Sequence, residues 1–193
     1  NECEATIKKY WEYYSLYETN RKNMIKKLMS TPTSDEFYTC LYEKCYYEAF
    51  KIMDYRHNFD DCTDEQIIEL YKLIDKLYYN GYLNKNYPFS EYVVSTKDDY
   101  HEECTFYTST TFTTKSEESK DKLSFGCCTS YESGHTTIFI NKEKLLKSNQ
   151  LDFSQVIDDG VVCKTRLQSL LCTLKHESVH QLIGEDFIRD KNN

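Results

Sequence analysis

Hydrophobic and aromatic residues recur every three or four positions through the first third of the chain, which is typical of helices that bury one face. The first such stretch runs from Glu4 to about Ser30 without Gly or Pro. A polar break follows, and Ser34 or Asp35 is the expected N-cap of a second helix that reaches about Tyr55. The pattern therefore predicts two N-terminal helices.

A third helix is predicted from its capping signals as well as from its periodicity. Thr63 precedes the apolar stripe and Gln66 stands three residues later, which is the pattern of a capping box. Gly81 is the expected C-terminal cap, because glycine readily adopts the left-handed conformation that ends many helices. The predicted buried stripe consists of Ile67, Leu70, Tyr71, Ile74, Leu77 and Tyr78.

After Pro88 the chain changes to short segments rich in β-branched and aromatic residues. These segments are FSEYVVS (89–95), CTFYTSTTFTT (104–114), KLSFGCCTSY (122–131) and HTTIFINK (135–142). They predict an antiparallel sheet of three or four strands, with a tight connection at Ser133 and Gly134.

The remainder of the chain is predicted to be mainly helical. A helical turn is expected at 142–148, an acidic loop at 152–160, and a long final helix from about Val161 to Ile183. Helices followed by strands and then a helix make an α+β layout. We predict two parts, a helical extension over residues 1–62 and a domain over residues 63–193.

Composition and charge indicate which classes of partner the protein is expected to bind. The net charge of −8 repels phosphate on average, so composition does not predict nucleic-acid binding. The run RKNMIKK (21–27) is the best candidate for a local basic patch, although the solvated face of a helix is the commoner origin of such a run. No apolar run approaches the ~18 residues needed to cross a bilayer, so no membrane partner is predicted.

The nine cysteines show no CxxC spacing, and their odd number cannot pair completely within one chain. The sequence also has no Asn-x-Ser/Thr acceptor. We therefore predict mostly reduced thiols and an intracellular protein, cytoplasmic or nuclear. Cys40 and Cys45 are spaced closely enough on a helix to form a metal pair, but two buried thiols are the commoner case.

The strongest chemical signal is the HExxH pattern of residues 176–180. His176 and His180 lie about one helical turn apart, so both imidazoles can bind one Zn²⁺ ion. Glu177 would lie beside the metal, where it can take a proton from zinc-bound water. The alternative is a pair of structural histidines. His135 could approach the site from a predicted strand, and no role is assigned to His57 or His101.

The helix around this motif is predicted to be buried on two sides. One apolar side contains Leu167, Leu170, Leu171 and Leu174, and the other contains Cys172, Val179 and Ile183. A polar stripe of Thr165, Ser169, Thr173, His176 and His180 runs between them. Histidines on a buried stripe require partners, and a metal ion is one that satisfies both.

Three segments, in this order, resemble the SprT-like (Spartan-type) zinc metalloproteases. LYKLIDKLYYNGYLNKNYP (70–88) is similar to the family's opening helix and its following turn, SFGCCTS…TTIFINKEKL (124–145) to its sheet, and LQSLLCTLKHESVHQLIG (167–184) to its active-site helix. The resemblance covers about residues 63–193. It implies an α+β fold with His176 and His180 as zinc ligands and Glu177 as the general base.

The resemblance also implies a third zinc ligand, which the family supplies as a histidine about a dozen residues after the second. Residues 181–193 contain no histidine, and Glu185 is the nearest oxygen donor. The chain stops short of that ligand, or the third ligand differs, or the site is degenerate.

We therefore expect a zinc-dependent endopeptidase that hydrolyses protein or peptide substrates. By resemblance alone, these would include nucleic-acid-associated proteins, as in the repair of DNA–protein crosslinks. The alternatives are a non-catalytic, degenerate module that binds a partner protein, and a structural zinc site completed by a thiol.

Overall fold

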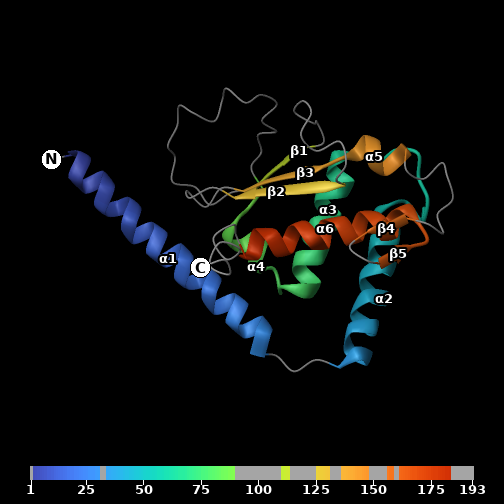
Figure 1. Cartoon of the computed structure of the whole chain (residues 1–193), viewed down its shortest axis with the longest axis horizontal. Coiled ribbons are helices and arrows are strands. Elements are labelled where there is room, and N and C mark those ends of the chain that lie inside the picture. The colour runs from blue at the N-terminus through green and yellow to red at the C-terminus, as the bar shows by residue number, and fades with distance from the viewer. Residues whose placement is uncertain are drawn as a thin grey trace.

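The structure of the protein is a computed structural model that describes residues 2–30, 34–89, 110–113, 125–130, 136–147, 156–158 and 161–183. Its helices are α1 (Glu2–Ser30), α2 (Asp35–Ile52), α3 (Asp64–Tyr78), α4 (Tyr82–Asn86), α5 (Lys142–Lys147) and α6 (Arg166–Ile183). Its strands are β1 (Thr110–Thr113), β2 (Gly126–Ser130), β3 (Thr136–Ile140), β4 (Val156–Asp158) and β5 (Val161–Cys163). The predicted mixture of helices and strands is confirmed (Figure 1).

The predicted N-caps in the first ninety residues are confirmed. Ser34 accepts a hydrogen bond from the Phe37 amide at the start of α2, and Thr63 and Gln66 form the predicted capping box of α3. The other end of α3 comes two residues earlier than predicted, because its C-cap is Tyr79 and Gly81 is the N-cap of α4. Gly81, with a φ of 75°, nevertheless lies in the left-handed region, and its amide donates to the Asp75 carbonyl oxygen at 3.0 Å.

The prediction of a purely antiparallel sheet is wrong. The strand order is β1-β3-β2, with β2 antiparallel to β3 but β1 parallel to it. An alternating sequence pattern reports which face of a strand is buried, and it contains no information about the direction of the neighbouring strand. Of the predicted strand segment 89–95 the structure describes only Phe89, which forms a bridge with Thr110. The predicted turn at Ser133 and Gly134 lies outside the described residues.

Two predictions near the final helix also need correction. Val161–Cys163 forms strand β5, which pairs with β4, so α6 begins at Arg166 rather than at Val161. The predicted acidic loop contains β4. The short β4–β5 hairpin thus occupies the segment that sequence periodicity assigned to a loop and to the first turn of the helix.

Helix α6 is the central element of the molecule. It packs against β2 and against α2 and α3, and it also contacts α1, α5 and the β4–β5 hairpin. Figure 1 shows α6 running alongside the sheet, with α2 and α3 crossing near it. The predicted apolar face of α6 is buried. Fully buried side chains at this centre are Ile67, Leu70, Ile74, Ile138, Leu167, Leu170 and Leu174.

Helix α2 belongs to the same core, although it precedes residue 63. Its Cys45 and Ala49, together with Met53 just after it, are buried among the side chains of α3 and α6. The boundary at residue 62 stays a prediction. Helix α2 nevertheless covers part of the apolar surfaces of α3 and α6.

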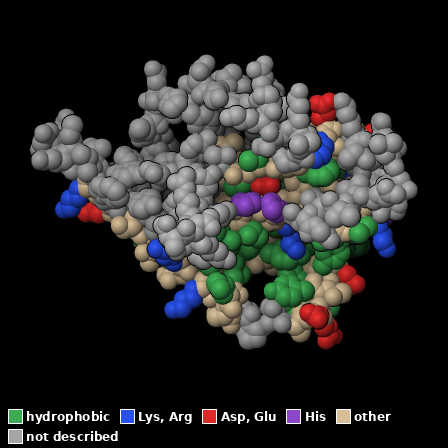
Figure 2. All heavy atoms as spheres, viewed as in Figure 1, with side chains coloured by type: hydrophobic (Ala, Val, Ile, Leu, Met, Phe, Trp, Pro, Cys, Tyr) green, Lys and Arg blue, Asp and Glu red, His purple; other side chains and the backbone are tan. Residues whose placement is uncertain are grey.

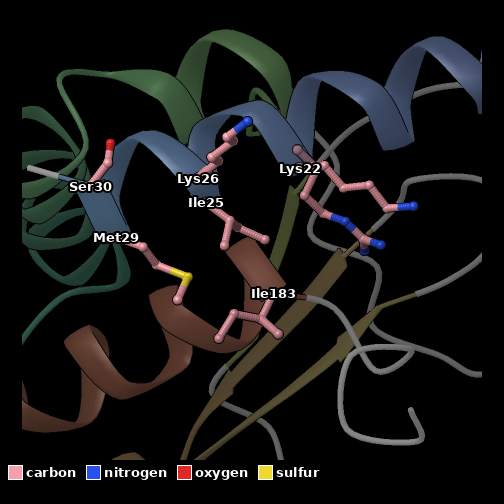
Figure 3. A pocket seen from close by; sticks show the side chains of 7 residues that line it. Lys22, Ile25, Lys26, Met29, Ser30 and Ile183 are labelled. Carbon is pink, nitrogen blue, oxygen red and sulfur yellow. The ribbon is translucent and has the colours of Figure 1, made fainter.

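Helix α1 meets the rest of the molecule through its C-terminal half. A groove of ≈ 380 Å³ lies there, between α1 and Ile183 at the end of α6 (Figure 3). Lys22 and Lys26 line it together with the apolar Ile25 and Met29. The basic run 21–27 therefore contributes to a groove, and its Arg21 is buried rather than solvated. Across the described residues, no helix combines the length and the apolar character that crossing a membrane requires.

Candidate metal centre and its supporting contacts

The two histidines of the HExxH motif converge on one point at the surface of α6. Their Nε2 atoms are 2.8 Å apart and their ring centroids 4.5 Å apart. His176 is exposed and His180 is half-buried. Figure 2 shows histidine side chains at the surface of this face, beside an acidic side chain and a group of hydrophobic side chains. The predicted pairing of the imidazoles by helical spacing is therefore present in the structure.

Glu177 is directed inward from the same turn of helix. Its side chain is only 3% exposed, and it lies against strand β2. A Cβ atom built on Gly126 would stand 2.8 Å from Glu177 Oε1 and 2.8 Å from Thr173 Cγ2. The absence of a side chain at Gly126 therefore leaves the space that the carboxylate occupies next to the sheet.

A chain of buried hydrogen bonds fixes the rotation of α6 about its own axis. Tyr71 of α3 donates to Gln181 Oε1 at 2.5 Å, and Gln181 Nε2 donates to Thr110 Oγ1 at 2.7 Å. Thr110 in turn donates to the Tyr87 carbonyl oxygen at 2.7 Å. Burial raises the pKa of Tyr71 well above its ordinary value, so the phenol stays protonated and able to donate.

A second contact holds the same helix one turn earlier. Tyr79 and Ser178 hydroxyls are 2.9 Å apart, and both residues are buried. Ser178 within the HExxH pattern and Gln181 just after it lie on the side of α6 opposite to the histidines, so their bonds to Tyr79 and Tyr71 direct His176 and His180 outward. Both bonds join residues separated by about a hundred positions, and sequence periodicity had no means of predicting them.

The N-terminus of α6 is held by a loop at residues 57–60. The Leu167 amide donates to the His57 carbonyl oxygen at 3.1 Å, and the Arg166 amide donates to Asn58 Oδ1 at 3.0 Å. The Arg166 guanidinium donates to the Phe59 carbonyl oxygen and forms an ion pair with Asp60. These bonds satisfy amides that a helix start leaves without an intrahelical acceptor.

The predicted polar stripe of α6 divides into two. Ser169 and Thr173 are buried on the side that faces the sheet, and Glu177 continues that line. His176 and His180 lie instead on the accessible side, next to Val179, which is 43% exposed. The prediction that Val179 lies on a second buried face is therefore wrong. A helical wheel gives the angle between two residues, but the neighbouring elements decide which angle is buried.

The other candidate ligands are not brought to this point within the described part of the chain. Among the residues that the structure describes, no group of three or more His, Cys, Asp or Glu side chains is arranged to hold a metal ion. Cys40 is exposed whereas Cys45 is buried, so this pair forms no shared site. Glu185, His101 and His135 lie outside the described residues.

His57, which the sequence left without a role, is part of an aromatic stack. Its ring lies 4.2 Å from that of Phe50, and Tyr46 Oη is 2.8 Å from its Nδ1. These residues line a cavity of ≈ 330 Å³ beside α2, remote in sequence from the HExxH motif. His57 is therefore accounted for by packing.

Comparisons with protein-family models, with curated proteins and with solved structures find no match to this chain.

Proposed function

We propose that this protein is a zinc-dependent endopeptidase of SprT-like type. The observation that carries the proposal is the convergence of His176 and His180, whose Nε2 atoms are 2.8 Å apart, with the buried carboxylate of Glu177 between them in sequence. Two nitrogen donors at one point and an adjacent base are among the protein groups that zinc-assisted hydrolysis uses, and a third protein ligand completes such a site.

The histidine pair fits a zinc ion in both chemistry and spacing. Two nitrogens bound to one tetrahedral zinc, each about 2.0–2.1 Å from the metal, lie about 3.3 Å apart. The separation of 2.8 Å between the two Nε2 atoms is that of an N–H···N hydrogen bond, in which one imidazole holds a proton. A small rotation of either ring widens this separation enough for both nitrogens to donate their lone pairs to zinc.

Zinc held by these imidazoles would polarise a scissile carbonyl group and acidify a water molecule. Glu177 accepts the proton of the attacking water and delivers it to the leaving amine. Its burial against Gly126 restricts the side chain to a narrow range of positions, which favours proton transfer along one path. The contacts of Gln181 and Ser178 with α3 keep the helix in the rotation that this geometry needs.

Strand β2 offers a place for an extended peptide. It packs against α6 and pairs with β3. An extended peptide bound beside β2 would run past Gly126 and the nearby carboxylate of Glu177. Proteins are therefore the proposed substrate class, and association of those proteins with nucleic acid stays a prediction of the family resemblance.

The alternative is a degenerate module that binds a partner protein without catalysis. The observation that favours it is the lack of a third described ligand beside the histidine pair. Two imidazoles alone hold zinc weakly, and such a site would lose its metal during purification.

Zinc content and proteolysis, measured on the same preparations, distinguish these functions. We expect about one zinc ion per chain in protein purified without chelator, and hydrolysis of an unstructured protein such as casein. The double variant His176→Ala/His180→Ala should lose both. Glu177→Gln should retain zinc but lose about 10²- to 10⁴-fold in rate, because it removes only the general base.

Two matched control variants test whether a substitution as such causes the loss of zinc or activity. His57→Ala removes a histidine from a packed aromatic stack, and Glu69→Gln changes an exposed glutamate on α3. Both should keep zinc and activity. Wild-type protein that contains no zinc after exposure to added Zn²⁺, or Glu177→Gln that hydrolyses casein at the wild-type rate, would refute the catalytic proposal.

A further inference from the structure

Two thiols lie in contact where the β4–β5 hairpin joins helix α6. Cys163 is the last residue of β5 and is 1% exposed, and Cys172 is half-buried in the second turn of α6. Their Sγ atoms are 3.9 Å apart. We propose that Cys163 and Cys172 form a reversible intramolecular disulfide, which makes the base of the HExxH helix a redox modification site.

The separation of the sulfurs is close to that of atoms in van der Waals contact, and a disulfide bond is about 2.05 Å long. The two thiols must therefore approach by about 2 Å. Cys163 is only three residues before the helix and at the end of a strand, so χ1 rotation with a small shift of the hairpin provides this movement. No rearrangement of the buried α3–α6 contacts is needed.

The two thiols differ in accessibility, which sets the order of the chemistry. A low-molecular-weight disulfide reaches the half-buried Cys172, whereas Cys163 is buried. The Cys172 thiolate attacks a low-molecular-weight disulfide, forms a mixed disulfide and releases one thiolate. Cys163 then attacks Cys172 Sγ and releases the second thiolate. The protein loses two electrons and two protons, and the small disulfide is reduced to two thiols.

The bond would connect the hairpin to the helix that carries the histidine pair. Cys172 is four residues, or about one turn, before His176, so the two side chains lie on the same side of α6. The cross-link closes the segment 163–172 and ties the first two turns of α6 to β5. This inference rests on the position of the thiols alone, and its test does not depend on zinc binding or proteolysis.

Peptide mapping of the full chain tests the proposal directly. Reduced protein is incubated with oxidised glutathione, remaining thiols are blocked with N-ethylmaleimide, and the protein is digested with trypsin without reduction. Cleavage after lysine and arginine places Cys163 in peptide 148–164 and Cys172 in peptide 167–175, with no other cysteine in either. We expect these two peptides joined, at the sum of their masses less two hydrogens, and separated again by dithiothreitol.

Thermal denaturation provides a second readout on the same samples. Closing this loop should raise the Tm by roughly 5 °C in the oxidised protein. Cys163→Ser and Cys172→Ser should each abolish both the joined peptides and the Tm increase. Cys40→Ser, which changes an exposed thiol on α2, should retain both effects.

Three results would overturn the proposal. The first is folded wild-type protein that carries N-ethylmaleimide on both cysteines after oxidation. The second is Cys172 joined to a different cysteine or only to glutathione. The third is joined peptides that derive from a dimer, which non-reducing size-exclusion chromatography detects before digestion.

Discussion

Asp75 and Glu177 are both carboxylates buried at the centre of the molecule, yet their surroundings differ. Asp75 is 1% exposed, and its two oxygens accept hydrogen bonds from the amides of Leu83 and Asn84, each at 2.8 Å. These amides belong to the first turns of α4, so Asp75 serves the fold. Glu177 is 3% exposed, lies against Gly126 of β2, and stands next to His176 in the sequence.

The comparison shows that burial alone does not assign a role to a carboxylate. Burial raises the pKa of Asp75, while its hydrogen bonds from the two backbone amides act in the opposite direction. The chemistry of the neighbouring groups distinguishes the two sites. Backbone amides need an acceptor in any folded state of this chain, whereas two converging imidazoles have no such structural requirement.

The largest expected difference appears when the two carboxylates are converted to amides. Glu177→Gln should reduce peptidase activity by about 10²- to 10⁴-fold and change the free energy of unfolding by less than about 1 kcal/mol, because it keeps volume and removes a buried charge. Asp75→Asn should lower the free energy of unfolding by about 2 kcal/mol, since one backbone amide loses a charged acceptor.

Urea denaturation and casein hydrolysis, measured side by side, check both halves of this prediction. The rate per folded molecule should be unchanged in Asp75→Asn. If Asp75→Asn abolished hydrolysis while remaining folded, or if Glu177→Gln unfolded the protein, the assignment of a structural role to Asp75 and a catalytic role to Glu177 would be contradicted.

A third buried group, the thiol of Cys45 on α2, shows how burial changes a pKa when neighbouring groups oppose the change only in part. Burial raises the pKa of Cys45 to about 11, an effect that Lys175 opposes only in part. At pH 8 this reduces the thiolate fraction by about 100-fold relative to the ordinary value of 9.0. We expect iodoacetamide to modify Cys45 at least about 100-fold more slowly than the exposed Cys40 of the same helix.

The same shift predicts a pH dependence of stability. The pKa of Cys45 is higher in the folded protein than in the unfolded chain. The contribution of Cys45 to folding is therefore fully present below pH 9.0 and is lost as the pH rises through about 11. Cys45→Ala should remove that part of the alkaline loss of stability. Equal alkylation rates for Cys40 and Cys45 in folded protein would contradict the assigned burial.

The smallest expected effect concerns the glycine beneath Glu177. In Gly126→Ala the new methyl group would lie 2.8 Å from both Glu177 Oε1 and Thr173 Cγ2, so the side chains of the glutamate and the threonine must both move. We expect a loss of about 1 kcal/mol in stability and about tenfold in activity. Gly81→Ala is the matched control, because its φ of 75° makes it strained while nothing lies within 4 Å of the new Cβ.

Gly81→Ala should therefore lose about 1 kcal/mol in stability without a change in the rate per folded molecule. Thermal unfolding and casein hydrolysis measured on both variants separate backbone strain from displacement of the base. A Gly126→Ala variant with full activity would show that the carboxylate tolerates displacement, and it would weaken the case for Glu177 as the positioned base.

Sequence patterns predicted those features that depend on residues within a few positions of each other. The N-caps at Ser34 and Thr63, and a helix end within two residues of Gly81, were predicted because each involves a hydrogen bond or a backbone conformation inside one turn. The convergence of His176 and His180 was predicted for the same reason, since a four-residue step is about one turn of helix.

Features that join distant segments were missed or wrong. The parallel pairing of β1 with β3, the β5 strand at Val161 and the exposure of Val179 all depend on which elements are neighbours. The support of the candidate site is likewise non-local. Tyr71 meets Gln181 across 110 residues, and Gln181 meets Thr110 across 71.

The sequence by itself thus determined a helix that presents two imidazoles on one side, with a glutamate between them in the sequence. Only the tertiary structure decided that the carboxylate faces inward over Gly126 while the imidazoles face outward, because that choice is the rotation of α6 about its axis. Periodicity leaves this rotation open. The buried bonds of Ser178 and Gln181 with α3 fix it, since breaking them would leave polar groups in the core without hydrogen bonds.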